Sequence, residues 1–450
     1  MPLPGSDSAT ASPTHHLLRD LYRVATEAVD PGPALAGRLR SLALPTGTEP
    51  WIIALGKAAT PMAEAAVAVL RERGASPAGG LIVAPRAGAV PDPRLTAVAG
   101  DHPEPGPGSF AAAEALGSLV ARTVSGSEVW VLLSGGTTSL LGAPEPGITP
   151  DELTALYALL LGSGLDITAM NRIRKRFSRW GGGKLARALQ GSSVRVYVVS
   201  DVIGDDLASI GSGPCVPDPA TATEVRQLLE TAGLWTRIPA AARALVAATE
   251  AGKTPETPKP GDRAFARVSH ELIASNRLAL EAAARHAAAV GLAPEVAVEP
   301  LAGEAAAAGT RLAAFLLQHC GPPDIPQPES GGTPRRCFIW GGETTVTLGS
   351  AAPGMGGRCQ ELALAAARTL DGAPAGVALL AAGTDGRDGP TDAAGAIVDP
   401  RTWSAAIAGG RDPERDLLGH DAYRSLDAAR ALLRPGLTGT NVMDIVVGLC

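Results

Sequence analysis

Lys57 lies where a predicted strand turns into a predicted helix, a position that suits a cation which binds an anion. Residues 51–55 are continuously apolar and predict a buried strand, and residues 60–72 have the spacing of a helix. A strand that turns through Gly56 into a helix presents free N–H groups and the positive helix end to an anion, and Lys57 adds a full charge. Lys57 could steady a phosphoryl group in transfer or hold a substrate carboxylate. The alternative is a surface lysine that closes a loop.

A second candidate segment, "LLSGGTTSLL", follows the predicted strand 128–133. Gly135 and Gly136 allow the backbone to approach a ligand, and the hydroxyls of Ser134 and Thr137 suit phosphate oxygens. The segment has neither the GxxxxGK[ST] spacing of a P-loop nor the GxGxxG of a dinucleotide site. A plain tight turn is therefore the alternative.

A third segment, "MNRIRKRFSRWGGGKLA" at 170–186, concentrates basic residues in a chain whose formal net charge is -6. Such a concentration favours an anion-binding wall, in which Asn171 and Arg174 are candidate ligands for a phosphate or substrate. The alternative is a solvated basic helix. The other cations of the segment are Arg172, Lys175, Arg176, Arg179 and Lys184.

Acidic residues follow two further predicted strands. Asp201 comes directly after strand 193–200, and Asp385 and Asp388 lie on the glycine-rich "AAGTDGRDGPTDAAG" after strand 377–382. Their carboxylates suit Mg²⁺, and Asp201 could also act as a general base. Because Asp after a strand is also a common helix N-cap, each of these residues has a structural alternative.

The C-terminal half contributes three more candidates. Glu343 follows a predicted strand in "GGETTVTLG", where it could bind substrate or phosphate. Arg358 begins a predicted helix after the glycines of "GMGGRCQELAL", and Gln360 lies beside it as a further phosphate or substrate ligand. Several of these candidates, such as Lys57, Asp201 and Glu343, lie just after predicted strands, where open α/β sheets bind their ligands.

Short apolar strands alternate with helices in the N-terminal half and predict a doubly wound parallel sheet of Rossmann type. We place a domain boundary in the polar, proline-rich stretch 251–263, with domains of residues 1–255 and 256–450. The remaining elements predicted before the boundary are helices 16–40, 109–124, 224–231 and 240–250, strand 80–84 and a turn-rich stretch 86–108. Those after it are strands 268–273, 294–298, 337–340 and 344–348, helices 277–290, 304–318, 359–369 and 426–433, and an exposed loop 321–335.

The composition is that of a globular protein of 450 residues, with 45% hydrophobic and 19% charged residues. The acidic balance, without a dense basic run, speaks against a nucleic-acid partner. No apolar run approaches the roughly 20 residues that span a bilayer, and the N-terminus lacks a signal-peptide pattern. Five scattered cysteines fit a reduced compartment. We therefore expect a soluble cytoplasmic protein without a membrane partner; a homo-oligomer remains open.

These segments, in this order, resemble the glycerate 2-kinase family, whose C-terminal part is the MOFRL domain. The resemblance spans nearly the whole chain and rests on long literal motifs. They are Gly56 to Ala59, Ser200 to Pro219, Ile273 to Asn276, Gly341 to Thr347, Gly356 to Leu364, Gly383 to Ala396 and Thr438 to Asp444.

The resemblance implies a Rossmann-like N-terminal domain, a C-terminal MOFRL-type α/β domain and an active site in the cleft between them. It also implies conversion of D-glycerate to 2-phospho-D-glycerate with ATP and Mg²⁺, with Lys57 and Arg358 as catalytic cations. Phosphoryl transfer needs positioning and charge stabilisation more than covalent chemistry, so two converging cations make physical sense. Asp201, or an acid of the Asp385 loop, would bind Mg²⁺ or take the hydroxyl proton.

The sequence departs from the family pattern at Thr137, Arg176 and Cys359, in segments expected to face ligands. The acceptor could therefore be a related hydroxy-acid. A second alternative is an NAD(P)H-dependent hydroxypyruvate reductase, a label that relatives have carried, although no GxGxxG follows the first strand. A third is a non-catalytic metabolite-binding regulator that keeps the fold.

Overall fold

The structure, a computed structural model, describes residues 12–319, 334–349 and 352–450. It contains two compact units. The first unit consists of residues 31–273, and the second of residues 1–30 together with 274–450. The predicted boundary between residues 255 and 256 falls inside the first unit.

The first unit is built on a six-stranded sheet with the order β3-β2-β1-β4-β5-β6. Strands β1 to β5 pair in parallel, and their central members are buried on both faces, as the apolar runs predicted. The strand order reverses between β1 and β4, which is the point where such sheets bind ligands. The strands are β1 (Trp51–Leu55), β2 (Gly79–Ala84), β3 (Leu95–Ala99), β4 (Glu128–Leu133), β5 (Ser193–Val199) and β6 (Val268–Ala274).

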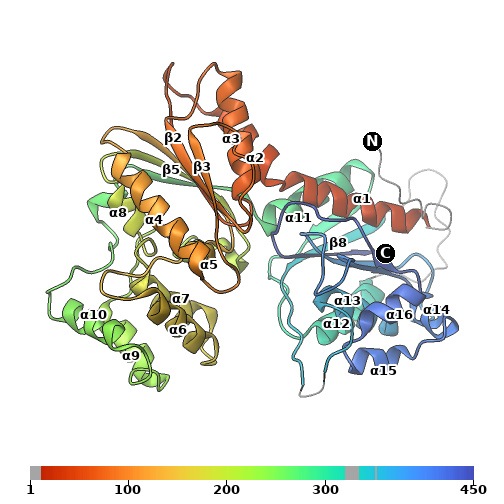
Figure 1. Cartoon of the computed structure of the whole chain (residues 1–450). Helices are drawn as coiled ribbons and strands as arrows, with labels where there is room; N and C mark the ends of the chain where they lie inside the picture. The colour runs from red at the N-terminus through yellow and green to blue at the C-terminus, as the bar shows by residue number, and fades with distance from the viewer. Residues whose placement is uncertain (1–11, 320–333, 350–351) are drawn as a thin grey trace. The chain divides into compact units, whose positions relative to one another are not determined.

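Helices cover both faces of this sheet (Figure 1). Helices α2 (Pro31–Ser41) and α3 (Ala59–Glu72) pack together, while α4 (Pro107–Arg122) and α8 (Lys184–Ala188) contribute to the core under the opposite face. A one-turn helix, α5 (Thr137–Leu140), follows β4. A separate cluster of helices has its own apolar core. The cluster consists of α6 (Pro150–Leu161), α7 (Ile167–Phe177), α9 (Ala222–Thr231) and α10 (Ala240–Glu250).

The second unit is built on a mixed six-stranded sheet with the order β11-β10-β9-β12-β8-β7. Strands β7 and β8 pair in parallel and the other pairs are antiparallel. The strands are β7 (Ala293–Val296), β8 (Arg336–Gly342), β9 (Ala378–Gly383), β10 (Gly395–Val398), β11 (Leu432–Leu433) and β12 (Asp444–Leu449). β12 lies between β8 and β9, so its residues are buried throughout.

Figure 1 shows helices on both sides of the second sheet. Helices α1 (Pro13–Ala28) and α11 (Asn276–Ala289) pack together on one face, and α12 (Ala305–His319) and α13 (Arg358–Leu370) pack together on the other. Most residues of α13 are buried, which makes it the central helix of this unit. Short helices α14 (Thr402–Ala408), α15 (Pro413–Leu418) and α16 (Ala422–Ala428) complete the layer.

The predicted fold class is confirmed, but several predicted elements are wrong. Residues 16–40 form two helices rather than one, because Pro31 cannot continue α1 and instead begins α2. The turn-rich stretch 86–108 contains strand β3. Residues 268–273 do not open the second unit, since β6 lies beside β5 in the first sheet.

Two corrections concern the C-terminal half. Residues 344–348 form no strand and make only an isolated bridge at Thr345, because the chain turns at Gly342, where φ is 141°. Helix α16 ends at Ala428, before the short strand β11, so the predicted helix 426–433 is wrong. Most of the predicted loop 321–335 lies outside the described residues.

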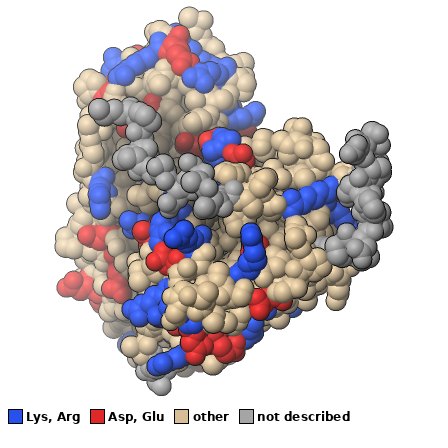
Figure 2. Space-filling view, turned by 90° about the vertical axis from the view of Figure 1, so that its right-hand side faces the viewer, with Lys and Arg blue, Asp and Glu red and all other residues tan. Residues whose placement is uncertain are grey.

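The charged surface of the protein is mixed in sign. Figure 2 shows basic and acidic side chains next to one another over the face that it draws. No helix in the described part of the chain is both long and apolar enough to cross a membrane.

Candidate functional site

The carboxyl ends of β1, β4 and β5 bring three of the predicted segments together. The N–H of Lys57 donates to the carbonyl of Gly135 at 3.0 Å, so the turn after β1 is bound to the turn after β4. A Cβ on Gly135 would lie 1.7 Å from Oδ2 of Asp201, and one on Gly136 would lie 3.2 Å from Cγ of Lys57. The side chains of Lys57 and Asp201 thus pack directly on the glycine pair, where only glycine leaves room for both.

The two predicted hydroxyl ligands of this loop are buried and hold its shape. Ser134 Oγ accepts from the N–H of Ala58 at 3.0 Å, and Thr137 Oγ1 donates to the carbonyl of Ser134 at 2.8 Å. Within the described residues, the N–H groups of Gly135 and Gly136 have no hydrogen-bond partner. The free donors of this loop are therefore backbone groups rather than the two hydroxyls.

Asp201 combines partial burial with a neighbouring cation. Burial raises the pKa of its carboxyl group, while the charge of Lys57 acts in the opposite direction. A carboxylate with a raised proton affinity beside an ammonium group can accept a proton from a hydroxyl or bind a divalent cation.

His102 also belongs to this site, although the sequence analysis did not identify it. Its Cδ2 would lie 3.3 Å from a Cβ on Gly136, beside the side chain of Lys57. Burial and the charge of Lys57 both lower the pKa of the imidazole. His102 follows strand β3, so the missed strand also hid the position of this residue at the ligand-binding edge of the sheet.

Helix α7 presents Asn171, Arg174 and Lys175, spaced i, i+3 and i+4, on one of its faces. Lys175 is only 5% exposed, and its ammonium group has no hydrogen bond or ion pair with the described residues. Burial lowers its pKa, and the charges of Asp218 and Asp206 oppose that effect. Arg174 lies over the ring of Tyr157, and its buried Nε has no hydrogen-bond partner. These cations are not a solvated surface, and they retain capacity to bind an anion.

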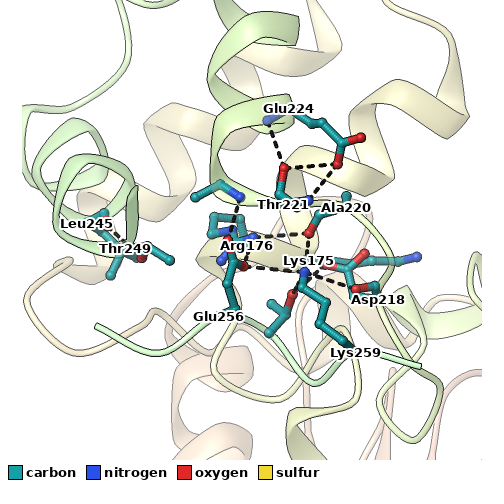
Figure 3. Close-up of polar contacts among 12 residues, drawn as sticks. Lys175, Arg176, Asp218, Ala220, Thr221, Glu224, Leu245, Thr249, Glu256 and Lys259 are labelled. Atoms are coloured by element: carbon teal, nitrogen blue, oxygen red, sulfur yellow. Dashed lines mark hydrogen bonds and ion pairs between the residues drawn. The ribbon is translucent and has the colours of Figure 1, made fainter. Parts of the chain in front are cut away.

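Arg176 points into a different network, which Figure 3 shows. Its guanidinium, 3% exposed, pairs with Glu256 and donates to the carbonyl of Ala220 at 3.2 Å. It lines a cavity of about 170 Å³ together with Lys184, which pairs with Glu145. Since these cations face carboxylates, the network ties the segment around Glu256 to α7 and is structural.

In the second unit, Arg358 begins α13 and is held by two carboxylates. Its Nε and Nη2 donate to Oδ2 and Oδ1 of Asp444 at 2.7 and 2.9 Å, and its Nη1 lies 2.6 Å from Oε1 of Glu343. Burial lowers the pKa of Arg358, but the hydrogen bonds that it donates to Asp444 outweigh this effect and raise the pKa overall. The guanidinium is therefore charged and remains 35% exposed.

Two predicted ligands near Arg358, Asp388 and Gln360, form hydrogen bonds with other residues of the protein. Both oxygens of Asp388 accept N–H groups at the start of α13, from Cys359 at 3.2 Å and from Gln360 at 2.8 Å. Burial raises the pKa of Asp388 to about 7. The fully buried Gln360 donates to Thr391 at 2.7 Å. Asp388 and Gln360 thus fix the turn from which Arg358 projects.

Asp385 is the more accessible acid of this loop. It is partly exposed, and its Oδ1 accepts from the N–H of Arg387 at 2.9 Å. Within the described residues, no three His, Cys, Asp or Glu side chains gather as they would in a protein-only metal cage.

The structure places the predicted residues in two groups, one in each unit. In the first unit, Lys57 and Asp201 lie on the glycine pair, and Asn171 and Arg174 lie on α7. The second joins Arg358 to Glu343, with Gln360 and Asp388 beneath it. Sequence reasoning missed the partner role of Asp444, although the motif that contains it, "TGTNVMD", was noted.

Comparisons with known proteins agree with this architecture. A family profile described as a domain of unknown function (DUF4147) matches residues 17–247, and one described as the MOFRL family matches residues 336–444. A crystal structure of glycerate kinase from Thermotoga maritima superposes with a TM-score of 0.83 at 34% identity, and the match covers 96% of this chain and 98% of that one.

Curated relatives are similar over most of the chain. "Glycerate 2-kinase" of Pyrococcus horikoshii is 36% identical over 399 residues, which cover 89% of this chain and 87% of the relative. A "putative hydroxypyruvate reductase" of Agrobacterium vitis is 35% identical over 432 residues, covering 95% and 93%. The fold and the two profile matches define a two-part α/β protein that joins a DUF4147 and a MOFRL domain. The chain belongs to the glycerate 2-kinase family, as its motifs predicted.

Proposed function

We propose that this protein is an ATP-dependent kinase that phosphorylates the 2-hydroxyl of D-glycerate. The observation that carries the proposal is the meeting of Lys57, Asp201 and Gly135 where the strand order of the first sheet reverses. A cation, a carboxylate and free backbone N–H groups at that edge are the groups that phosphoryl transfer uses. The names of the relatives supply the acceptor, since curated family members are called glycerate 2-kinase.

The proposed roles follow from charge and burial. Lys57 and the free N–H groups of Gly135 and Gly136 stabilise the charge on the transferred phosphoryl group. Lys175 and Arg174, which lack carboxylate partners within the described residues, bind further phosphate oxygens. Arg358 adds a second catalytic cation from the other unit, and we propose that both cations serve the same transfer.

Asp201 is the candidate for the general base or for a ligand of Mg²⁺. Its raised pKa suits a base that accepts the proton of the acceptor hydroxyl, and its carboxylate equally suits Mg²⁺. In kinases Mg²⁺ is held by one or two carboxylates together with substrate phosphates, so the residues present fit such an ion without a three-carboxylate cage. Asp385 is the second available carboxylate, whereas both oxygens of Asp388 already accept N–H groups. Bound Mg²⁺ would neutralise charge on the nucleotide phosphates.

A hydroxypyruvate reductase is the second candidate, because a similar protein of Agrobacterium vitis carries that name. The turn after β1 argues against it, since a dinucleotide site needs glycines there, whereas this chain has Lys57 packed on Gly136. We also propose that the protein acts in the cytoplasm on small molecules.

The test is a product analysis of the purified protein with ATP, Mg²⁺ and a panel of short hydroxy-acids that includes D-glycerate. We expect ADP and 2-phospho-D-glycerate, identified by ³¹P and ¹H NMR. A parallel reaction follows NADH and NADPH with hydroxypyruvate at the absorbance of the reduced cofactor. Oxidation of either cofactor, with no ADP formed from any acceptor, would favour the reductase and refute the kinase.

A further inference from the structure

The guanidinium of Arg358 uses one complete edge to bind Asp444. Nε and Nη2 form two parallel hydrogen bonds with the two carboxylate oxygens, at 2.7 and 2.9 Å. This bidentate geometry fixes the plane of the guanidinium as well as its distance from the carboxylate. The opposite edge carries Nη1, which lies 2.6 Å from Glu343. Of the two carboxylates, Asp444 is 2% exposed and Glu343 is 39% exposed.

Asp444 is itself held firmly in place. It is the first residue of β12 and pairs with Gly342 of β8 on one side and Gly383 of β9 on the other. The side chain of Asn276 donates to the carbonyls of Asp444 at 2.9 Å and Val442 at 2.8 Å. The backbone beneath the carboxylate is therefore fixed by the sheet and by one amide side chain.

The glycines of β8 allow this arrangement. A Cβ on Gly341 would lie 1.9 Å from Oδ1 of Asn276, so only glycine at 341 leaves room for the amide that fixes Asp444. Two residues of this stretch therefore support the pair of Asp444 and Arg358. Gly341 leaves room for the Asn276 side chain that fixes Asp444, and Glu343 contacts the exposed edge of Arg358.

The buried carboxylate of Asp444 is paired with a cation. An ionised carboxylate away from water is costly unless a cation pairs with it, and Arg358 is the partner that the structure provides. Asp444 in turn holds the long, flexible side chain of Arg358 in a single orientation. The other edge, with Nη1, pairs with Glu343, which is partly exposed and is the group that an incoming anion would displace.

We propose that Asp444 is a positioning residue for phosphoryl transfer, whose buried carboxylate orients Arg358 so that Nη1 meets the phosphoryl group or the substrate anion. The inference rests on the proposed kinase function. Asp444 acts through Arg358 and does not touch the substrate. This distinguishes it from a metal ligand or a base, whose loss would add to the loss of Arg358.

The test measures kcat and KM for D-glycerate in Asp444→Asn, Arg358→Ala and the double variant. Asp444→Asn keeps the side-chain shape but loses one acceptor and the charge, so we expect kcat to fall by about 10²-fold. Because Asp444 acts through Arg358, the double variant should be no slower than Arg358→Ala by more than about 3-fold. A double variant slowed by the product of the two single effects would overturn the proposal.

Asp444→Glu separates positioning from charge neutralisation, and it covers the case in which Asp444→Asn fails to fold. The variant keeps a buried negative charge for Arg358 but moves the carboxylate along by one methylene. If Asp444 only balances charge, turnover stays at the wild-type level. If it positions Arg358, kcat falls by about 10-fold or more while the circular dichroism spectrum is unchanged.

A matched control is Asp427→Asn, which removes another carboxylate that pairs with an arginine in the same unit, at 2.7 Å from Nη2 of Arg434. Its kcat should equal that of the wild type. Failure of the inference and failure of the proposed function are distinguishable. Wild-type protein that does not phosphorylate D-glycerate contradicts the function, whereas active wild type with fully active Asp444→Asn and Asp444→Glu variants contradicts only the role of Asp444.

Discussion

Gly135→Ala would push the carboxylate of Asp201 away from the glycine pair. The new Cβ would lie 1.7 Å from Oδ2 and 2.4 Å from Cγ of Asp201, distances that no real Cβ contact shows. To reach an ordinary contact of 3.4 Å, the carboxylate has to retreat by about 1.7 Å, the difference between 3.4 Å and 1.7 Å. The substitution thus displaces the proposed base or magnesium ligand without removing its charge.

The expected cost follows from the sensitivity of catalysis to geometry. A displacement of about 1 Å commonly lowers the rate by about 10²-fold, equivalent to roughly 2.7 kcal/mol in the activation free energy. We therefore expect kcat with D-glycerate to fall by at least about 10²-fold. The assay follows ADP release through a coupled reaction at saturating ATP and Mg²⁺.

Two controls isolate the clash. Gly88→Ala adds a methyl group at a glycine with no neighbour within 4 Å, so its rate should equal that of the wild type. In an Asp201→Ala background the clash is gone, so Gly135→Ala should cause no further loss. A folded Gly135→Ala protein with the wild-type rate would refute the placement of Asp201 on the glycine pair.

Three further predictions concern the charged groups. Lys175→Met should raise KM for ATP by about 10-fold, whereas Arg172→Met, at an exposed position of the same helix, should leave it unchanged. Equal effects of the two substitutions in nucleotide titrations would contradict phosphate binding by Lys175. Because burial raises the pKa of Asp388 to about 7, the native state binds more protons than the unfolded state between about pH 4 and pH 7. The contribution of Asp388 to the free energy of unfolding should therefore fall as pH rises through this range, and urea titrations of Asp388→Asn should show that slope removed. Arg176→Met should destabilise the protein by about 1–3 kcal/mol, less than for a fully buried pair because Glu256 is 34% exposed; thermal unfolding unchanged from the wild type would contradict a structural role.

The sequence predicted the first sheet well because its strands are short, apolar and buried on both faces. Residues 51–55 and 128–133 were assigned with the bounds that the structure shows. Strand β3 was missed because it lies at the sheet edge, is only partly buried and sits among turn residues. The break between α1 and α2 was missed because apolar spacing continues across Pro31.

Within the site, sequence spacing located charges but not their partners. Residues after parallel strands were expected to lie together, since the carboxyl ends of such strands share one edge, and the structure brings Lys57, Gly135 and Asp201 together there. Their roles in catalysis stay a prediction. Contacts between distant segments, such as Arg358 with Asp444 or Asp388 with the start of α13, depend on strand order and left no local signal.

The departures from the family pattern have a different meaning in the structure. Thr137, Arg176 and Cys359 were expected to face ligands, but all three side chains are buried. Thr137 binds a neighbouring backbone group and Arg176 pairs with a carboxylate, while Cys359, in the first turn of α13, belongs to the apolar core of the second unit. These three departures therefore lie in residues that support the surrounding structure.

The central proposal is that Lys57 and Arg358 are both catalytic cations in the phosphorylation of D-glycerate. The most direct measurement is kcat for D-glycerate phosphorylation in Lys57→Ala and Arg358→Ala, with the exposed Lys253→Ala as a control and circular dichroism as the check of folding. We predict that each catalytic variant loses about 10²-fold or more, while the control is unchanged. Folded variants that both phosphorylate D-glycerate at the wild-type rate would contradict the account.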